Sequence, residues 1–164
     1  VLILLLKPYK VGDFIVAQGE VGTVKEIQIF HSVLKTPDNK TVIIPNGPMA
    51  NGNITNITHE KTRKVEWKFG IGYDDDLKKA KKLIERILKK DKRVLQDEGL
   101  QIVLGELADS SVVIITRAWT KKEDYWNLFF DINEAVKETF DANGISIPYP
   151  QRDMHMYHHD KGKK

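Results

Sequence analysis

Closely spaced turn signals divide residues 13–58 into segments too short for ordinary helices. These signals are Gly19-Glu20, Pro37-Asp38-Asn39, Asn46-Gly47-Pro48 and Asn51-Gly52. Glycine, proline and asparagine in such clusters favour chain reversals. The apolar residues between them alternate as in strands, and Val42–Ile44 has the pattern of a short buried strand. Val24 and Ile27 would share a face only across a β-bulge. The region therefore predicts a small barrel or sandwich of short strands.

The chain opens on six consecutive apolar residues, Val1–Leu6, and turns polar at Lys7. Six residues cannot cross a bilayer, which needs about 20. We expect this run to be the end of a longer apolar helix, so that the chain is the soluble part of a protein that begins in a membrane. Lys7 and Lys10 follow the run directly. Cationic residues beside a membrane helix favour the cytoplasmic side.

The second half of the chain predicts strands and helices in alternation. Strands are expected at 62–72, 100–107, 111–120 and 145–147, and helices at 77–88 and 123–142. Tyr73 and three aspartates, Asp74–Asp76, precede the first helix, where carboxylates favour and can cap a helix start. The order strand, helix, strand, strand, helix, strand is that of the ferredoxin-like fold, with two helices on one face of an antiparallel sheet.

The net charge of +3 is spread unevenly along the chain. Residues 77–93 hold nine Lys or Arg against Glu85 and Asp91, so this segment carries +7 and the remainder −4. A basic helix face can bind nucleic acid or acidic lipid. Because most charge runs are only solvated outer faces, we prefer that interpretation here.

A short segment at the end of the chain lacks a partner. Prolines at 148 and 150 block continuation of any strand or helix. Gln151–Tyr157 then alternates weakly, with Met154 and Met156 on one face. A lone strand is not stable by itself. We therefore expect this segment to pair with copies of itself.

No motif for catalysis or cofactor binding is evident. The absence of cysteine excludes disulfides and thiolate metal sites. Gly70-Ile71-Gly72 resembles part of a dinucleotide loop, but Asp75 stands where the third glycine belongs and the aspartates would repel a phosphate. His155, His158 and His159 fit a loose surface tail better than a metal site. We expect no cofactor, no metal and no enzymatic activity.

Several motifs together resemble the small-conductance mechanosensitive channels of bacteria, the MscS family. They are Lys7-Pro8-Tyr9-Lys10-Val11-Gly12-Asp13, Gly22-Thr23-Val24, Val42–Gly47, Gly52-Asn53-Ile54 and Gly144–Gln151. The resemblance runs from about residue 1 to residue 157, and the first and last motifs are specific in combination.

The resemblance implies an architecture and a function. Members of this family are homo-heptamers of the bacterial inner membrane that open under membrane tension and release ions and small solutes during hypo-osmotic shock. The α+β fold implied for this chain has five parts: the residual end of the pore-lining transmembrane helix (1–7), a small Sm-like β-barrel domain (8–59), a ferredoxin-like α/β domain (60–147), a linker and C-terminal barrel strand (148–157) and a disordered tail (158–164). Together they would form a hollow cytoplasmic vestibule, which ions enter through side portals.

The resemblance also implies two groups of functional residues. Asn46 and Gly47 would contact the pore helix, and a positive φ angle at Gly47 is a further expectation. Gln151, Asp153, Met154, His155 and Met156 would belong to a barrel built by the seven terminal strands. Since side chains alternate in a barrel, either Met154 and Met156 or Asp153 and His155 would line its bore.

Two rival interpretations remain at this stage. A Sm-like barrel with a basic helix could be a ring-forming RNA-binding protein, which would present aromatic or arginine stacking groups on exposed loops. The loops near Asp38 and Gly47 offer Pro, Asn, Lys and Met instead, so we expect no nucleic acid partner. The ferredoxin-like half could be a small enzyme or regulatory domain, but no ligand motif supports that.

Overall fold

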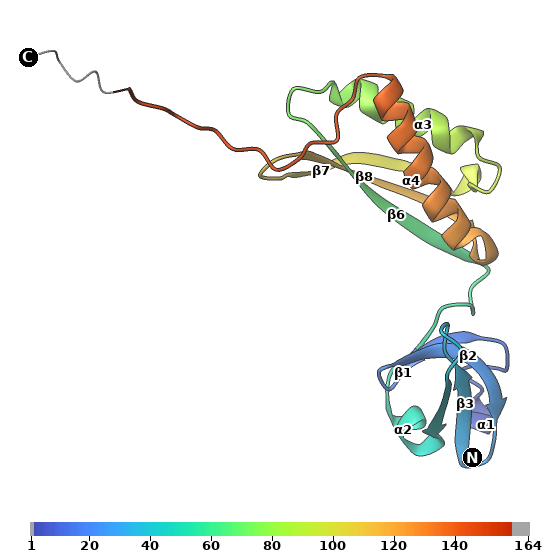
Figure 1. The fold of residues 1–164 in the computed structure, drawn as a ribbon. Helices are drawn as coiled ribbons and strands as arrows, with labels where there is room; N and C mark the ends of the chain where they lie inside the picture. The colour runs from blue at the N-terminus through green and yellow to red at the C-terminus, as the bar shows by residue number, and fades with distance from the viewer. Residues whose placement is uncertain (1, 159–164) are drawn as a thin grey trace, which may run out of the picture. The chain divides into compact units, whose positions relative to one another are not determined.

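The computed structural model describes residues 2–158 and has two compact units, Val1–Thr62 and Arg63–Lys164. Figure 1 follows the chain through both of them. The first unit is mostly strands, and the second combines a sheet with two long helices. Within residues 2–158, no helix is long and apolar enough to cross a bilayer.

The first unit is built on one antiparallel sheet of five strands, in the order β4-β3-β2-β1-β5. Its elements are α1 (Leu2–Leu6), β1 (Phe14–Ala17), β2 (Glu20–Ile27), β3 (His31–Lys35), β4 (Thr41–Pro45), α2 (Asn46–Asn51) and β5 (Ile54–Asn56). The register of β2 against β3 shifts between Val24 and Glu26. Val24 and Ile27 consequently pack on the same core, which confirms the predicted bulge.

Residues 46–51 differ from the sequence prediction. Asn46-Gly47-Pro48 forms the first turn of the short helix α2, and not a reversal between strands. Pro48 is tolerated there because backbone N–H groups in the first turn of a helix have no intrahelical acceptor. The helix buries Met49 completely, beside Ile3 of α1 and Ile44 of β4. Turn-forming residues therefore serve here as a helix start.

The second unit contains a three-stranded sheet in the order β6-β8-β7. Its elements are β6 (Thr62–Ile71), α3 (Leu77–Lys90), a short 3-10 turn (Gln96–Glu98), β7 (Gln101–Leu107), β8 (Val112–Lys121), a second 3-10 turn (Lys122–Asp124) and α4 (Tyr125–Ala142). Both helices lie on one face of this sheet (Figure 1). The N–H of Lys79 donates to the Asp76 carboxylate at 3.0 Å, so the predicted capping of α3 by an aspartate is confirmed.

The predicted strand at 145–147 is absent, so the ferredoxin-like expectation fails in its fourth strand. Ile145 does bury its side chain, but its N–H donates to the Phe140 carbonyl at 3.0 Å. Ser146 donates from its N–H and its hydroxyl to Oδ2 of Asp75, at 2.9 and 2.6 Å. A carboxylate thus satisfies the polar groups that a strand ladder would otherwise pair.

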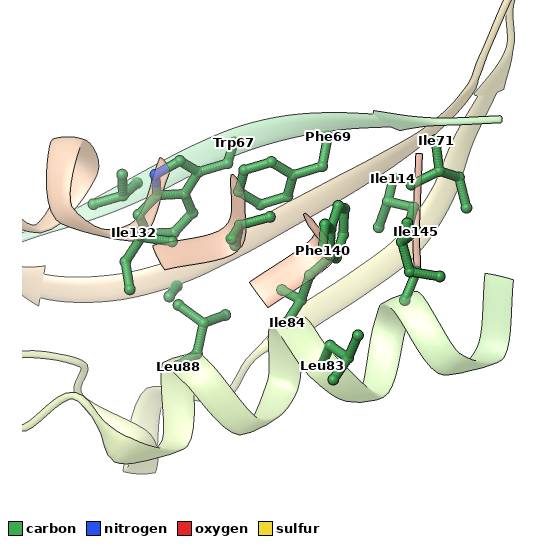
Figure 2. Close-up of a cluster of buried hydrophobic side chains, with 14 of the residues drawn as sticks. Trp67, Phe69, Ile71, Leu83, Ile84, Leu88, Ile114, Ile132, Phe140 and Ile145 are labelled. Carbon is green, nitrogen blue, oxygen red and sulfur yellow. The ribbon is translucent and has the colours of Figure 1, made fainter. Parts of the chain in front are cut away.

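The core of the second unit lies between the sheet and the helices (Figure 2). Trp67, Phe69 and Ile71 point from β6 toward the helices. Leu83, Ile84 and Leu88 of α3 and Ile132 and Phe140 of α4 meet them. The ring of Phe140 lies edge-on to that of Phe69, with centroids 6.4 Å apart. These contacts fix α3 and α4 to the sheet and leave the basic side of α3 in solvent.

Candidate functional site

Asn46 lies at the point where β4 ends and α2 begins. The preceding residue, Pro45, is extended (φ −58°, ψ 137°) and makes no side-chain cap. The Asn46 side chain is nevertheless buried, with 6% of its surface exposed. A buried amide is costly unless its polar atoms are paired, so its partners determine what this residue does.

Every polar atom of the Asn46 side chain has a partner in the β2–β3 region. Its Oδ1 accepts from the Ser32 hydroxyl at 2.8 Å. Its Nδ2 donates to the carbonyls of Gln28 at 2.6 Å and Ile29 at 3.1 Å. Its backbone N–H donates to the Phe30 carbonyl at 2.8 Å. Because two carbonyls require a donor, they fix the orientation of the amide. Asn46 therefore fastens the start of α2 to the β2–β3 turn.

Tyr9 extends this network toward the N-terminal segment. Its hydroxyl lies 2.7 Å from Oγ of Ser32, and both side chains are buried. Since Ser32 donates to Asn46, its oxygen is free to accept from Tyr9. Burial raises the pKa of the Tyr9 phenol, an effect that the hydrogen bond with Ser32 partly offsets. The phenol consequently stays protonated and able to donate at neutral pH. Hydrogen bonds thus run from Tyr9 through Ser32 to Asn46 and the turn.

Gly47 is exposed, unlike its neighbour Asn46. It is helical, and it is absent from the residues with positive φ, so the expectation of a positive φ angle is wrong. A Cβ added to Gly47 would meet no atom within 4 Å. A side chain at this position would point outward without straining the chain. Asn46 and Gly47 therefore differ although they are adjacent. The Asn46 side chain makes all its hydrogen bonds within the unit, whereas Gly47 is exposed and can contact another part of the protein.

The helix α1 packs beside α2 through apolar side chains. Ile3 and Met49 are buried in the same core. An apolar cavity of about 290 Å³ lies beside them, with Leu6 and Ala50 in its lining. The sequence analysis gave no structural role to Ser32 or Met49, and it named Tyr9 only as part of a motif. An asparagine directly after a buried strand indicates that its side chain needs hydrogen-bond partners, but the sequence does not identify these partners.

Asp13 forms a second polar centre, just before β1. Its carboxylate accepts from the Asn56 amide at 2.8 Å, the Lys10 N–H at 3.1 Å and the Thr58 hydroxyl at 3.4 Å. Burial alone would raise the pKa of Asp13, but these hydrogen bonds and the Lys10 charge outweigh it, so that the pKa is lowered. The ionised carboxylate thus ties the start of β1 to β5 and the residues that follow it.

The predicted barrel residues lie in the second unit, in a segment with no regular structure. Gln151 to Tyr157 are all exposed, and no strand pairs with them within the described part of the chain. Gln151 is held at one point, where its N–H donates to the Ser110 hydroxyl at 3.0 Å. Met154, Met156 and Tyr157 expose at least three-quarters of their surface. The segment is thus an extended chain with unused backbone groups and exposed apolar side chains.

Among residues 2–158, no group of three or more His, Asp or Glu side chains is placed so that it could hold a metal ion. His155 and His158 are exposed. His159 and the rest of the predicted tail, 160–164, lie outside the described residues.

Substituting Ser32 tests the buried network. Ser32→Ala should lower the free energy of unfolding by about 1–3 kcal/mol, because Oδ1 of Asn46 and the Tyr9 hydroxyl both lose a buried partner. Tyr9→Phe should cost less, and the double variant less than the sum of the two, because they share one hydrogen bond. Urea unfolding of the four proteins measures this coupling. Strictly additive costs would show that Tyr9 and Ser32 are not coupled.

A pH titration tests the Asp13 centre. A carboxyl group with a lowered folded pKa stabilises the protein above its unfolded pKa of about 3.9, and this contribution is lost as the pH falls through the folded pKa. Asp13→Asn should therefore be less stable than the parent at pH 7, and the difference should shrink below about pH 4. Unfolding curves from pH 7 to pH 3 give this difference. A difference that is constant or grows on acidification contradicts the assignment.

Comparison with known proteins places both units in one family. Residues 1–59 match the model of the mechanosensitive ion channel β-domain, and residues 65–147 match that of the MscS C-terminal region. A small-conductance mechanosensitive channel of Edwardsiella ictaluri is 40% identical over 157 residues, which are 96% of this chain and 55% of that protein. The chain thus spans slightly more than half the length of this curated relative.

Solved structures agree with these matches. The closed-state crystal structure of Helicobacter pylori MscS superposes with a TM-score of 0.91 at 29% identity, over 96% of this chain and 63% of that one. Arabidopsis thaliana MSL1, solved by cryo-electron microscopy, gives 0.76 at 20% identity over 90% and 55%, which supports the fold alone. Two consecutive family matches that together cover most of the chain leave one conclusion: the chain belongs to the MscS family of mechanosensitive ion channels.

Proposed function

We propose that this chain is the cytoplasmic vestibule of a small-conductance mechanosensitive channel in a bacterial inner membrane. The whole protein would open under membrane tension and release ions and small solutes during hypo-osmotic shock. The observation that carries the proposal is that a β-domain match at residues 1–59 is followed by a C-terminal-domain match of the same family at residues 65–147. Membership in a channel family also agrees with the expectation that the chain is not an enzyme.

In this proposal the five-stranded sheet belongs to a Sm-like barrel domain (8–59), followed by the α/β domain (60–147). Residues 1–7 would be the cytoplasmic end of the pore-lining helix, residues 148–157 the linker and barrel strand, and 158–164 the tail. Support comes from α1, whose Leu5 and Leu6 are largely exposed and apolar. Exposed leucines in consecutive positions suit a helix whose surface is covered by lipid or by another protein chain.

Asn46 and Gly47 have different proposed roles at the pore helix. The side chain of Asn46 is hydrogen-bonded to Ser32 and to the β2–β3 turn. It would therefore position α2 and make no contact with the pore helix itself. Gly47, exposed on the first turn of α2, would supply the contact surface. We infer that the buried hydrogen bonds of Asn46 hold the exposed surface at Gly47 in a fixed position relative to the end of the pore helix.

The vestibule would be a homo-heptamer closed at its base by the terminal segments. The physical support comes from residues 152–157, whose backbone N–H and C=O groups form no strand pairing within the described part of the chain. Such groups favour strand pairing with another chain. Seven copies around an axis would satisfy each other and leave no free edge, with Gln151, Asp153, Met154, His155 and Met156 inside this barrel.

The rival RNA-binding ring has no comparable support. Its strongest sequence feature is the basic segment at 77–93, and two of the nine basic residues there form ion pairs in the structure. Arg93 pairs with Asp91 and Asp131, and Lys89 with Glu85. The family matches concern ion channels throughout.

Survival of osmotic downshock tests the proposed function. The full-length protein should rescue a bacterium that lacks its own mechanosensitive channels when cells are diluted from high-salt into low-salt medium. An empty vector is the control, and membrane insertion is verified by immunoblot. Inserted protein that gives no better survival than the vector would argue against the channel function.

Substituting Gly47 tests the contact surface. Gly47→Asp in the full-length channel should change gating or inactivation under sustained tension and leave the fold intact, because the new side chain points into open space. Asn39→Asp adds the same charge at a β-turn, where the positive φ of 70° suits Asp, and serves as the control. Patch-clamp recording measures both variants. Unchanged kinetics in Gly47→Asp would remove this residue from the gating contact.

Truncation tests the closure of the assembly. Deleting Gln151–Lys164 removes all the unpaired backbone groups of the terminal segment and leaves the helices and strands of both units whole. The shortened chain should keep its circular dichroism spectrum but assemble less, or dissociate at lower denaturant. Light scattering of both proteins at equal concentration measures the assembly. If mass and resistance to dissociation are equal, the terminal segment is not a closure element.

A further inference from the structure

A groove beside α3 combines positive charge with an apolar floor. Its cavity of about 390 Å³ lies between α3 and the edge strand β7. Lys78, Lys81 and Lys82 line the α3 side, and Leu100 and Ile102 line the β7 side. This volume is within the range of pockets that hold small molecules.

The three lysines form one stripe along the helix. Residues three and four apart on a helix are neighbours, with Cβ atoms about 5–6 Å apart. Lys81 and Lys82 follow Lys78 at these intervals. Three like charges on one stripe repel one another. An anion bound among them would relieve that repulsion.

These ammonium groups form no ion pair within residues 2–158. Three other basic residues of this segment are paired: Lys79 donates from Nζ to the Asn143 carbonyl at 2.6 Å, and Lys89 and Arg93 form ion pairs. The ammonium groups of Lys78, Lys81 and Lys82 make no hydrogen bond to another residue there. Glu85, the acidic residue of the groove, pairs with Lys89 at 2.6 Å. The groove therefore carries net positive charge toward solvent.

We propose that this groove binds nucleoside polyphosphates. A chain of phosphates can contact all three ammonium groups, whereas a single carboxylate reaches fewer of them. Lysine binds phosphate as a point charge without a fixed fork geometry. The base or sugar would lie on the half-buried side chains of Leu100 and Ile102. Since the lining offers few polar groups to read a base edge, the site selects for phosphates and an apolar face, with little preference among bases.

The inference is independent of the channel function, because binding is measured without any current. ATP is titrated into the 164-residue chain by calorimetry, with tripolyphosphate and adenosine as the separate halves of the ligand. ATP should bind more tightly than tripolyphosphate, adenosine should bind least, and ATP affinity should fall with added salt. Binding of ATP no tighter than tripolyphosphate contradicts a nucleoside site.

A matched pair of triple variants locates the site. Lys78→Gln/Lys81→Gln/Lys82→Gln should weaken ATP binding at least tenfold. Arg86→Gln/Lys90→Gln/Lys92→Gln removes the same charge from residues that do not line the groove and should change the affinity less than twofold. Equal losses in the two variants would mean non-specific attraction to a basic segment and would overturn the proposal, as would the absence of saturable ATP binding to the parent chain.

Discussion

The arrangement of the first unit depends on the hydrogen bonds of one buried side-chain amide, that of Asn46. Asn46 lies where β4 ends and α2 begins. Its amide is buried, and hydrogen bonds to Ser32 and to two carbonyls of the β2–β3 turn replace those it would make with water. A buried amide whose polar atoms are all hydrogen-bonded makes the surrounding structure more rigid. A buried amide without these hydrogen bonds lowers the stability of the fold. The same contacts therefore fix the start of α2, orient Gly47 outward and, through Tyr9, connect the segment that follows α1.

In the second unit, a carboxylate has a role like that of the Asn46 amide. Asp75 accepts from the N–H of Gly72 and from the N–H and hydroxyl of Ser146. It thereby fixes the chain after α4 without a fourth strand, and Ile145 completes the core. The terminal segment follows this fixed point, and after Gln151 it pairs with no strand among residues 2–158. In our account the assembly, and not the single subunit, supplies that partner.

The sequence analysis correctly predicted features that depend on residues close together in the chain. The bulge between Val24 and Glu26 follows from strand periodicity, and capping of α3 by Asp76 follows from carboxylates before an apolar helix. The strand expected at 145–147 failed because its pairing was decided by Asp75, 71 residues away. The network of Asn46 was missed because two of its acceptors are backbone carbonyls, which carry no residue-specific signal in a sequence.

The most direct test of the account is single-channel recording under suction from membranes that contain the full-length protein. The account predicts discrete current steps that appear as suction rises and stop when it is released. Control membranes without the protein should stay silent over the same pressures. Membranes that hold the inserted protein and show no suction-dependent current up to the rupture of the patch would contradict the assignment of this chain to a tension-gated channel.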